Sequence, residues 1–255
     1  MMTLSDEKSV SRRLRPPLHW KFAVSARKRW LGLKRLLGLT QPGEFLRCSY
    51  YGADFLIPPK GNVFGELILK RYEWFQLPRF IEACERLRPA TFIDVGAHCG
   101  IYTCVLGRRR LIPRLIAFEP NRTTLVHLKT HLMINGLLDI VELHEGAAGE
   151  KQGTAELFPQ EGLTHIVNSG GAYKVSITPL DDVVDLEGQT VAIKIDVEGY
   201  EMAVLEGGAR LFSHNHGYAQ IEALQNQERK VIPLMRAFGW RLRDKIYDDL
   251  IFEKP

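Results

Sequence analysis

Cysteines are few in this chain, and long apolar runs are missing. Four of the 255 residues are cysteines, and their spacing matches neither a zinc ribbon nor a Cys-x-x-Cys redox pair. We therefore expect free thiols in a reducing, cytoplasmic setting. No stretch approaches the ~20 apolar residues that span a bilayer, which argues against an integral membrane protein. The first residues also lack the apolar core of a secretory signal.

The overall composition excludes several other classes of protein. Hydrophobic residues make up 45% of the chain and charged residues 25%, which are average values for globular domains. Wholesale disorder, collagen and a disulfide-stapled mini-protein are therefore excluded. The length fits one α/β domain with additions, or two small domains.

Positive charge is concentrated at the amino terminus. Residues 1–40 contain ten Lys or Arg and two acids, a net charge of +8. Because the whole chain has a net charge of +4, the other 215 residues sum to −4. An apolar stripe of helical period runs from Phe22 to Leu37 among these basic residues. A stripe of this kind in the leader, residues 1–44, can contact a membrane peripherally through residues 19–38, at the inner face. The alternatives are that the stripe caps the main domain or forms a dimer. No nucleic-acid partner is expected, because the rest of the chain is acidic.

Strand and helix patterns alternate after residue 90. A hairpin over 45–57, with its turn at residues 51–54, and helices near 63–75 and 78–88 precede this region. Strands are predicted at 91–95, 115–119, 140–144, 174–178, 191–195 and 218–223, and the chain closes with a hairpin over 240–246 and 249–253. Helices are predicted at 100–107, 121–134, 199–206 and 228–238, and residues 149–180 read as a longer irregular piece. The pattern predicts an α/β fold with a mostly parallel, doubly wound sheet, and domain boundaries at 1–44, 45–90 and 91–255.

Acidic residues stand at or near the ends of five predicted strands. They are Asp94, Glu119, Glu145, Asp196 with Glu198, and Glu222. In doubly wound sheets ligands bind beyond the carboxyl ends of the strands, so these side chains point to one site. Two histidines, His127 and His131, are four residues apart on a predicted helix. With no third ligand nearby in sequence, we interpret them as a partly exposed helix face and not as a metal site.

The first strand end differs from a diphosphate-binding turn. Its sequence from Asp94 to Gly100 places two glycines in a Gly-x-x-x-Gly turn and not in the Gly-x-Gly-x-x-Gly cradle. An acid beside the turn would repel a diphosphate but suits a ligand with an ammonium group. An acid at the second strand end, Glu119, commonly accepts hydrogen bonds from ribose hydroxyls. A nucleoside with a cationic amino-acid tail and no phosphate, S-adenosylmethionine, fits both.

In several stretches the sequence resembles the FkbM-type methyltransferases, within the class I S-adenosylmethionine-dependent group. The matching stretches are FIDVGAHCGIYT (92–103), AFEPN (117–121), ITPLDD (177–182) and IKIDVEGYEMAVLEGG (193–208). The resemblance covers roughly residues 72–223. It implies a seven-stranded Rossmann-like methyltransferase sheet with a carboxyl-terminal antiparallel hairpin and an amino-terminal helical and hairpin extension. It also implies methylation of hydroxyl oxygens of sugars, glycans or related natural products.

The resemblance assigns roles to residues at the strand ends. It implies cofactor contacts by Asp94, Gly96 and Gly100, ribose contacts by Glu119, and an active-site role for Asp196 and Glu198. One departure is His98, where the family more often has Asn. Neighbours of these positions complete the expected cofactor site: Ala97, His98, Tyr102, Pro120, Asn121, Gly146 and Ala147.

The fourth main strand supplies the candidate base. Lys194 and Asp196 point to the same side of the strand because side chains alternate with a period of two. A lysine in an apolar strand is costly unless it is paired, so we expect it to orient Asp196. We assign catalytic candidates as Asp196, Glu198 and Glu222, with a carboxylate as general base. The acids could host a magnesium ion, but nothing in their spacing requires one.

These inferences predict an S-adenosylmethionine-dependent O-methyltransferase that modifies a glycan or a related small molecule. The alternatives are an N-methyltransferase on the same fold, a nicotinamide-dependent oxidoreductase, and a non-catalytic binding module. The sequence does not specify the acceptor or the oligomeric state.

Overall fold

The computed structural model describes residues 45–57, 72–160, 163–167, 170–224 and 227–255. The chain divides into two compact units, one of Met1–Leu46 and Ile57–Phe75 and the other of Arg47–Leu56 and Gln76–Pro255. The basic leader and the membrane contact suggested for residues 19–38 lie outside the described residues, as does most of the helix predicted at 63–75. No helix among the described residues is both long enough and apolar enough to cross a membrane.

A seven-stranded sheet forms the centre of the larger unit, in the order β12-β13-β11-β10-β3-β4-β5. Its strands are β3 (Thr91–Val95), β4 (Arg114–Phe118), β5 (Val141–His144), β10 (Thr190–Ile195), β11 (His216–Glu222), β12 (Arg241–Ile246) and β13 (Asp249–Lys254). Strands β5, β4, β3, β10 and β11 are parallel, and β13 pairs antiparallel with both β11 and β12. This topology confirms the predicted Rossmann-like sheet with its closing hairpin.

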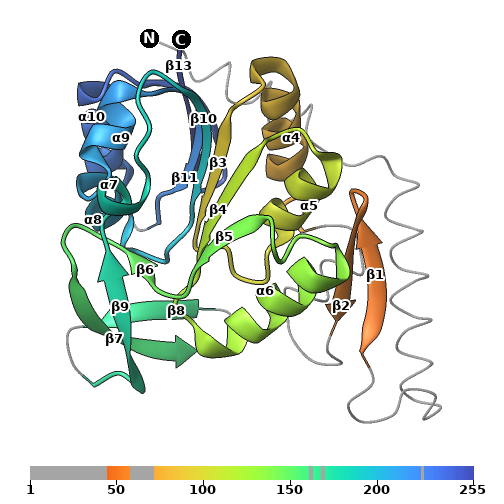
Figure 1. Cartoon of the computed structure of the whole chain (residues 1–255). Coiled ribbons are helices and arrows are strands. Elements are labelled where there is room, and N and C mark those ends of the chain that lie inside the picture. The colour runs from red at the N-terminus through yellow and green to blue at the C-terminus, as the bar shows by residue number, and fades with distance from the viewer. Residues whose placement is uncertain (1–44, 58–71, 161–162, 168–169, 225–226) are drawn as a thin grey trace. The chain divides into compact units, whose positions relative to one another are not determined.

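Helices cover both faces of this sheet (Figure 1), with α4 and α5 on one side and α7 to α10 on the other. Their bounds are α4 (Gln76–Leu87), α5 (Ile101–Arg109), α6 (Arg122–Ile134), α7 (Leu180–Val183), α8 (Glu201–Glu206), α9 (Ala209–His214) and α10 (Glu228–Ala237). On the first side, the Phe80 ring packs edge-on against Phe92, Tyr102 and Tyr218. On the other, alternate residues of β10 join Phe212 and Trp240 in one large core.

A second, four-stranded sheet replaces the predicted irregular piece at 149–180. It has the order β6-β9-β7-β8, with β6 (Ala147–Ala148), β7 (Gly153–Gln160), β8 (Leu163–Val167) and β9 (Tyr173–Thr178). The interpretation as irregular structure was therefore wrong for most of this segment. Gly153 and Pro159 lie within β7. Both residue types are unusual inside strands, so they interrupt the pattern by which a strand is predicted.

The predicted amino-terminal hairpin is confirmed. Its strands are β1 (Leu46–Tyr50) and β2 (Ala53–Ile57), and Tyr51 and Gly52 form the turn with φ values of 47° and 88°. Two positive φ values are typical of the tight turns that suit hairpin twist. The turn is shorter than predicted, since residues 53 and 54 already belong to β2.

Side chains of α6 and of its C-cap residue, Asn135, fasten this hairpin. Asn135 accepts a hydrogen bond from the Asp54 amide at 2.9 Å and donates one to the Asp54 carbonyl at 2.7 Å. His131 is fully buried, with Nδ1 2.7 Å from the Cys99 carbonyl and Nε2 3.1 Å from the Leu56 backbone. The expectation of a partly exposed histidine face was therefore wrong for His131, which is a structural link.

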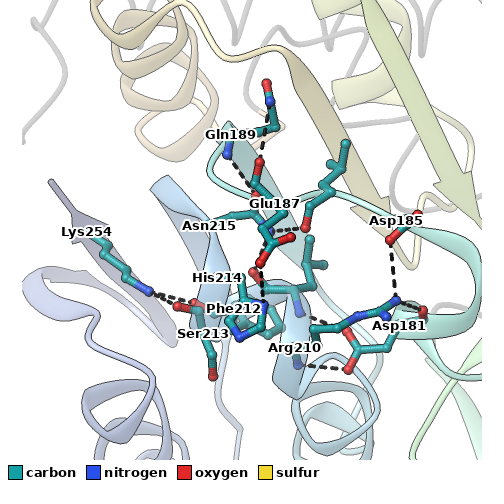
Figure 2. A network of polar contacts seen from close by, with 12 residues as sticks. Asp181, Asp185, Glu187, Gln189, Arg210, Phe212, Ser213, His214, Asn215 and Lys254 are labelled. Atoms are coloured by element: carbon teal, nitrogen blue, oxygen red, sulfur yellow. Dashed lines mark hydrogen bonds and ion pairs between the residues drawn. The ribbon is translucent and has the colours of Figure 1, made fainter.

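Helix α9 is held at both ends by charged side chains (Figure 2). The Asp181 carboxylate accepts hydrogen bonds from the backbone amides of Arg210 and Leu211, both at 2.8 Å. The Lys254 ammonium donates to the Phe212 and Ser213 carbonyls near the other end. An acid at the start and a cation at the end of a helix both complement its dipole.

Candidate active site

The carboxyl edge of the sheet gathers the acids that the sequence places at strand ends. Strand β3 lies between β4 and β10. The chain adds β4 and β5 on one side of β3, and then β10 and β11 on the other side. This is the switch point at which doubly wound sheets form their ligand crevice. Asp94 and Glu119 come from the β3 and β4 side of it, and Asp196 and Glu222 from the β10 and β11 side.

The glycine turn after β3 packs tightly against the end of β10. Gly96 has a φ of 83°, and a Cβ added there would overlap the backbone oxygen of Asp196. Its amide and that of Ala97 both donate to the Phe118 carbonyl, at 3.0 and 2.9 Å. The Gly96 position therefore admits only glycine, because both the conformation and the space exclude a side chain. The turn joins three strand ends into one rigid unit.

Asp94 lies beneath this turn and not at its surface. Its side chain is 1% exposed and accepts a hydrogen bond from the Thr103 hydroxyl at 2.5 Å. Burial raises the pKa of Asp94, and the charge of Lys194 and the Thr103 hydrogen bond oppose that rise. Lys194 stands directly opposite it on β10. Asp94 therefore ties the end of β3 to the first turn of α5.

Glu119 closes the second strand end. One carboxylate oxygen accepts from the His98 amide and the other from the Asn121 amide, both at 2.8 Å. Burial raises its pKa to about 7, although both amide hydrogen bonds act in the opposite direction. Each oxygen keeps a further lone pair, so the carboxylate can still accept hydrogen bonds from a ligand's hydroxyl groups. Asn121 itself caps α6 through the Thr123 amide.

His98 occupies an unusual position between the two halves of the site. It adopts a φ of 51°, and its Nδ1 is buried without a hydrogen-bond partner among the described residues. Burial lowers its pKa to about 4, which leaves the ring neutral at physiological pH. Strained residues and orphaned polar atoms of this kind often mark ligand sites.

Three acids meet at the ends of β10 and β11. Asp196, Glu198 and Glu222 each offer a carboxylate oxygen, and these oxygens lie within 4.8 Å of one another. The Lys194 ammonium contacts Asp196 at 2.8 Å, and its side chain is only 5% exposed. Glu198 has a φ of 53°, so a second non-glycine residue of the site lies in the left-handed region. The arrangement would also accept a cation, since oxygen ligands suit divalent ions.

Asp196 and Glu222 differ in ionisation. Burial raises the pKa of Asp196, but the Lys194 charge and hydrogen bond outweigh it and bring that pKa below its ordinary value. Burial and the neighbouring Asp196 raise the pKa of Glu222 to about 9. At neutral pH Asp196 is therefore ionised and Glu222 protonated, with Glu222 donating a hydrogen bond to its neighbour. A pair of titratable groups separated in this way is a common basis of acid–base chemistry.

A buried polar network that the sequence did not reveal supports Lys194. The Gln220 amide donates to the Tyr102 hydroxyl at 3.1 Å and to Asp249 at 3.0 Å. The Gln76 amide donates to the other oxygen of Asp249 at 3.1 Å. Tyr102 lies within this network, with its ring 5.1 Å from the Lys194 ammonium. A polar Gln within the apolar strand β11 was the available signal, whereas nothing local identifies Gln76 or Asp249.

The remaining residues of the predicted cofactor site lie at the edges of the crevice. A Cβ at Gly146 would overlap the Ser176 hydroxyl, and Ala147 begins β6 opposite Ile177, so both belong to the junction with the small sheet. Pro120 links Glu119 to the Asn121 cap. Gly100 has a φ of 80°, and a side chain there would collide with Leu128 of α6.

Comparison with known proteins gives a specific family match. Residues 94–242 match the Methyltransferase FkbM domain, and no curated protein matches the chain. Among solved structures, Methyltransferase FkbM from Methylobacillus flagellatus KT is similar at 18% identity and a TM-score of 0.49, over 75% of this chain and 54% of that one. The chain thus spans about half the length of that protein.

Two further structures are similar at lower TM-scores. A methyltransferase from Geobacter sulfurreducens has 15% identity and a TM-score of 0.45, over 70% of this chain and 76% of that chain. TYW2 from M. jannaschii, in complex with AdoMet, has 14% identity and a TM-score of 0.40, over 85% and 89%.

Proposed function

This chain belongs to the FkbM methyltransferase family, and from that premise we propose that it methylates a hydroxyl oxygen of a sugar, glycan or related natural product, with S-adenosylmethionine as methyl donor. The observation that carries the proposal is an ionised Asp196, held by a buried Lys194 at the switch point. A carboxylate at this place can remove a hydroxyl proton. Family membership favours methyl transfer over the nicotinamide-dependent alternative.

The residues on the β3 and β4 side fit the proposed donor. Glu119 keeps lone pairs for ribose hydroxyls, and the buried Nδ1 of His98 has no protein partner among the described residues. S-adenosylmethionine supplies a methyl group on a positively charged sulfur. Glu119 would hold the ribose, the turn from Gly96 to Gly100 would shape the binding site, and Asp94 would hold α5 against the end of β3.

The chain's own contribution to the chemistry is orientation and proton removal. Holding the acceptor oxygen in line with the methyl carbon and the sulfur can supply several kcal/mol, up to ~7–11. With S-adenosylmethionine bound as methyl donor, Asp196 would accept the proton that the acceptor hydroxyl loses on methylation. Lys194 keeps Asp196 ionised before this step, and the protonated Glu222 shares a hydrogen bond with Asp196.

We test the proposal by following a labelled methyl group. The protein is incubated with radiolabelled S-adenosylmethionine and a cell-envelope extract, and the labelled product is identified by mass spectrometry. Wild type and the control Asp182→Asn, which alters an exposed acid of α7, should transfer label, whereas Asp196→Asn should not. A methyl ether supports the proposal, an N-methyl product supports the alternative, and label transfer by Asp196→Asn contradicts the assigned base.

The basic leader carries a separate proposal, since its apolar stripe and its ten cations suit an anionic lipid surface. Deletion of residues 1–40 should abolish binding to anionic liposomes and leave binding to neutral liposomes unchanged. Equal binding by the full chain and the truncated chain would exclude membrane contact through residues 19–38.

A further inference from the structure

A basic groove lies between α10 and the edge strand β12, on the same side of the site as Asp196, Glu198 and Glu222. We call these three residues the acid cluster. The groove is a shallow depression, broadly open to solvent, with a volume of about 510 Å³. We call it the α10–β12 groove, and its lining includes Arg229, Ile232, Arg236, Leu242, Lys245 and Leu250.

The charge of these two elements is strongly one-sided. Together α10 and β12 contain six basic and two acidic residues, a net charge of +4. Both acids are already engaged, Glu228 by Lys245 and Asp244 by Arg79. Across the described part of the chain, neither Arg229 nor Arg236 has a carboxylate partner. Two free guanidinium groups therefore face the groove.

The floor of the groove is apolar. Leu250 is fully buried in the sheet, and the half-buried Ile232 and Leu242 pack against the same core. An apolar floor with arginines at its margin suits an organic molecule that carries an anionic group. Guanidinium groups bind phosphate oxygens in pairs, which gives both affinity and a defined orientation.

Two contacts connect the elements of the groove to the acid cluster. Gln227, just before α10, donates a hydrogen bond to the Gly199 carbonyl at 3.0 Å, next to Glu198. On the sheet side, Leu250 of the groove follows Asp249, which pairs with Glu222. The acids repel an anion, whereas the arginines attract it. One elongated acceptor could therefore place a hydroxyl at Asp196 and its anion in the groove.

We propose that the α10–β12 groove binds the phosphate or diphosphate group of the methyl acceptor, so that the acceptor is a phosphorylated glycoside. This inference rests on the proposed function, since it assigns the groove to the same substrate. A sugar diphosphate linked to a lipid and one linked to a nucleoside share this chemistry.

The test measures anion binding without the reaction. Inorganic pyrophosphate, uridine diphosphate glucose and farnesyl diphosphate are titrated by calorimetry into wild type, into Arg229→Gln/Arg236→Gln, and into the control Lys230→Gln/Arg241→Gln. The control removes two exposed cations from the same two elements, outside the groove. Circular dichroism confirms that each variant is folded.

The groove variant should bind pyrophosphate about 10-fold more weakly than wild type, because each guanidinium that lines the groove can bind phosphate through two parallel hydrogen bonds. The control should bind within about 3-fold of wild type, because its two cations lie outside the groove and act only through screened, long-range charge. The tighter of the two organic probes identifies the nucleoside or the lipid as the carrier. Equal weakening by both variants, or no anion binding by wild type, would overturn the inference.

A second readout separates this inference from the proposed function. With the labelled acceptor identified above, the groove variant should raise the KM for the acceptor and leave kcat near the wild-type value. An unchanged KM would overturn the inference and leave methyl transfer intact. Absence of any methyl transfer by wild type would instead overturn the proposed function, while the pyrophosphate titration would still report on the groove.

Discussion

At the scale of single residues, the site depends on one buried cation. Lys194 contacts Asp196 and stands opposite Asp94 on the neighbouring strand. Its charge lowers the pKa of both carboxyls against the effect of burial. Without it, the buried Asp94 and the half-buried Asp196 would lose their compensating charge, which is a costly arrangement. The lysine therefore determines whether Asp196 is ionised when the acceptor arrives.

Lys194→Gln should shift the pH dependence of methyl transfer. Loss of the ammonium raises the pKa of Asp196, so the acid limb of the kcat profile should move to higher pH, and activity at pH 7 should fall at least ~10-fold. The measurement is kcat from pH 5 to 9, with Lys151→Gln, at an exposed ion pair, as the control. A lower kcat at every pH without movement of the limb would show that Lys194 is only structural.

Glu222 makes the folded state sensitive to alkaline pH. Its pKa is raised from 4.5 to about 9 in the folded chain, so its contribution to stability is fully present below pH 4.5 and is lost as pH rises through 9. Gln mimics the protonated form and does not titrate. The Tm of Glu222→Gln should therefore match wild type at pH 5 and exceed it increasingly up to pH 9. A Tm difference that does not change with pH would contradict the protonated Glu222.

At the scale of elements, short segments are positioned by side chains far along the chain. Asp181 caps the six-residue α9 from 29 residues away. His131 of α6 and Asn135, which caps the end of that helix, fasten the β1–β2 hairpin. A short helix is marginal alone, so tertiary caps of this kind decide whether it forms. Neither link has a local sequence signature.

Asp181→Ala should therefore destabilise the fold. Loss of the hydrogen bonds to the Arg210 and Leu211 amides should lower the free energy of unfolding by about 1–2 kcal/mol. Urea unfolding provides the measurement. The control is Asp185→Ala, since the Asp185 side chain is 98% exposed and should change stability by less than about 0.5 kcal/mol. Equal effects of the two substitutions would show that Asp181 does not act as a cap.

Sequence reasoning succeeded for the main sheet because its strands are short apolar runs between clear helix and turn signals. Strand β10, Thr190–Ile195, is a clear example. In the small sheet it found β9, predicted at 174–178, but it missed β7 and β8. Strand β7 contains Gly and Pro, and its pairing with β9 is set by distant residues. Hydrophobic periodicity reports on burial and not on which strands pair.

At the scale of the whole molecule, the two sides of the switch point carry different kinds of functional group. The β3 and β4 ends present Glu119 and His98, with lone pairs and an orphaned ring nitrogen. The β10 and β11 ends present Asp196, Glu198 and Glu222 around one lysine. The sequence located both groups, because strand ends meet at one edge. It could not show that Asp94 is sealed beneath the turn or that Glu222 holds a proton, because both depend on packing between elements.

The most direct test of this division is a calorimetric titration of S-adenosylmethionine into wild type, Glu119→Ala and Asp196→Asn. The structure predicts at least ~10-fold weaker binding for Glu119→Ala, because a carboxylate that accepts ribose hydrogen bonds is lost. Asp196→Asn should bind within ~3-fold of wild type, since its carboxylate serves the acceptor side of the site. Unchanged affinity in Glu119→Ala together with lost affinity in Asp196→Asn would contradict the account.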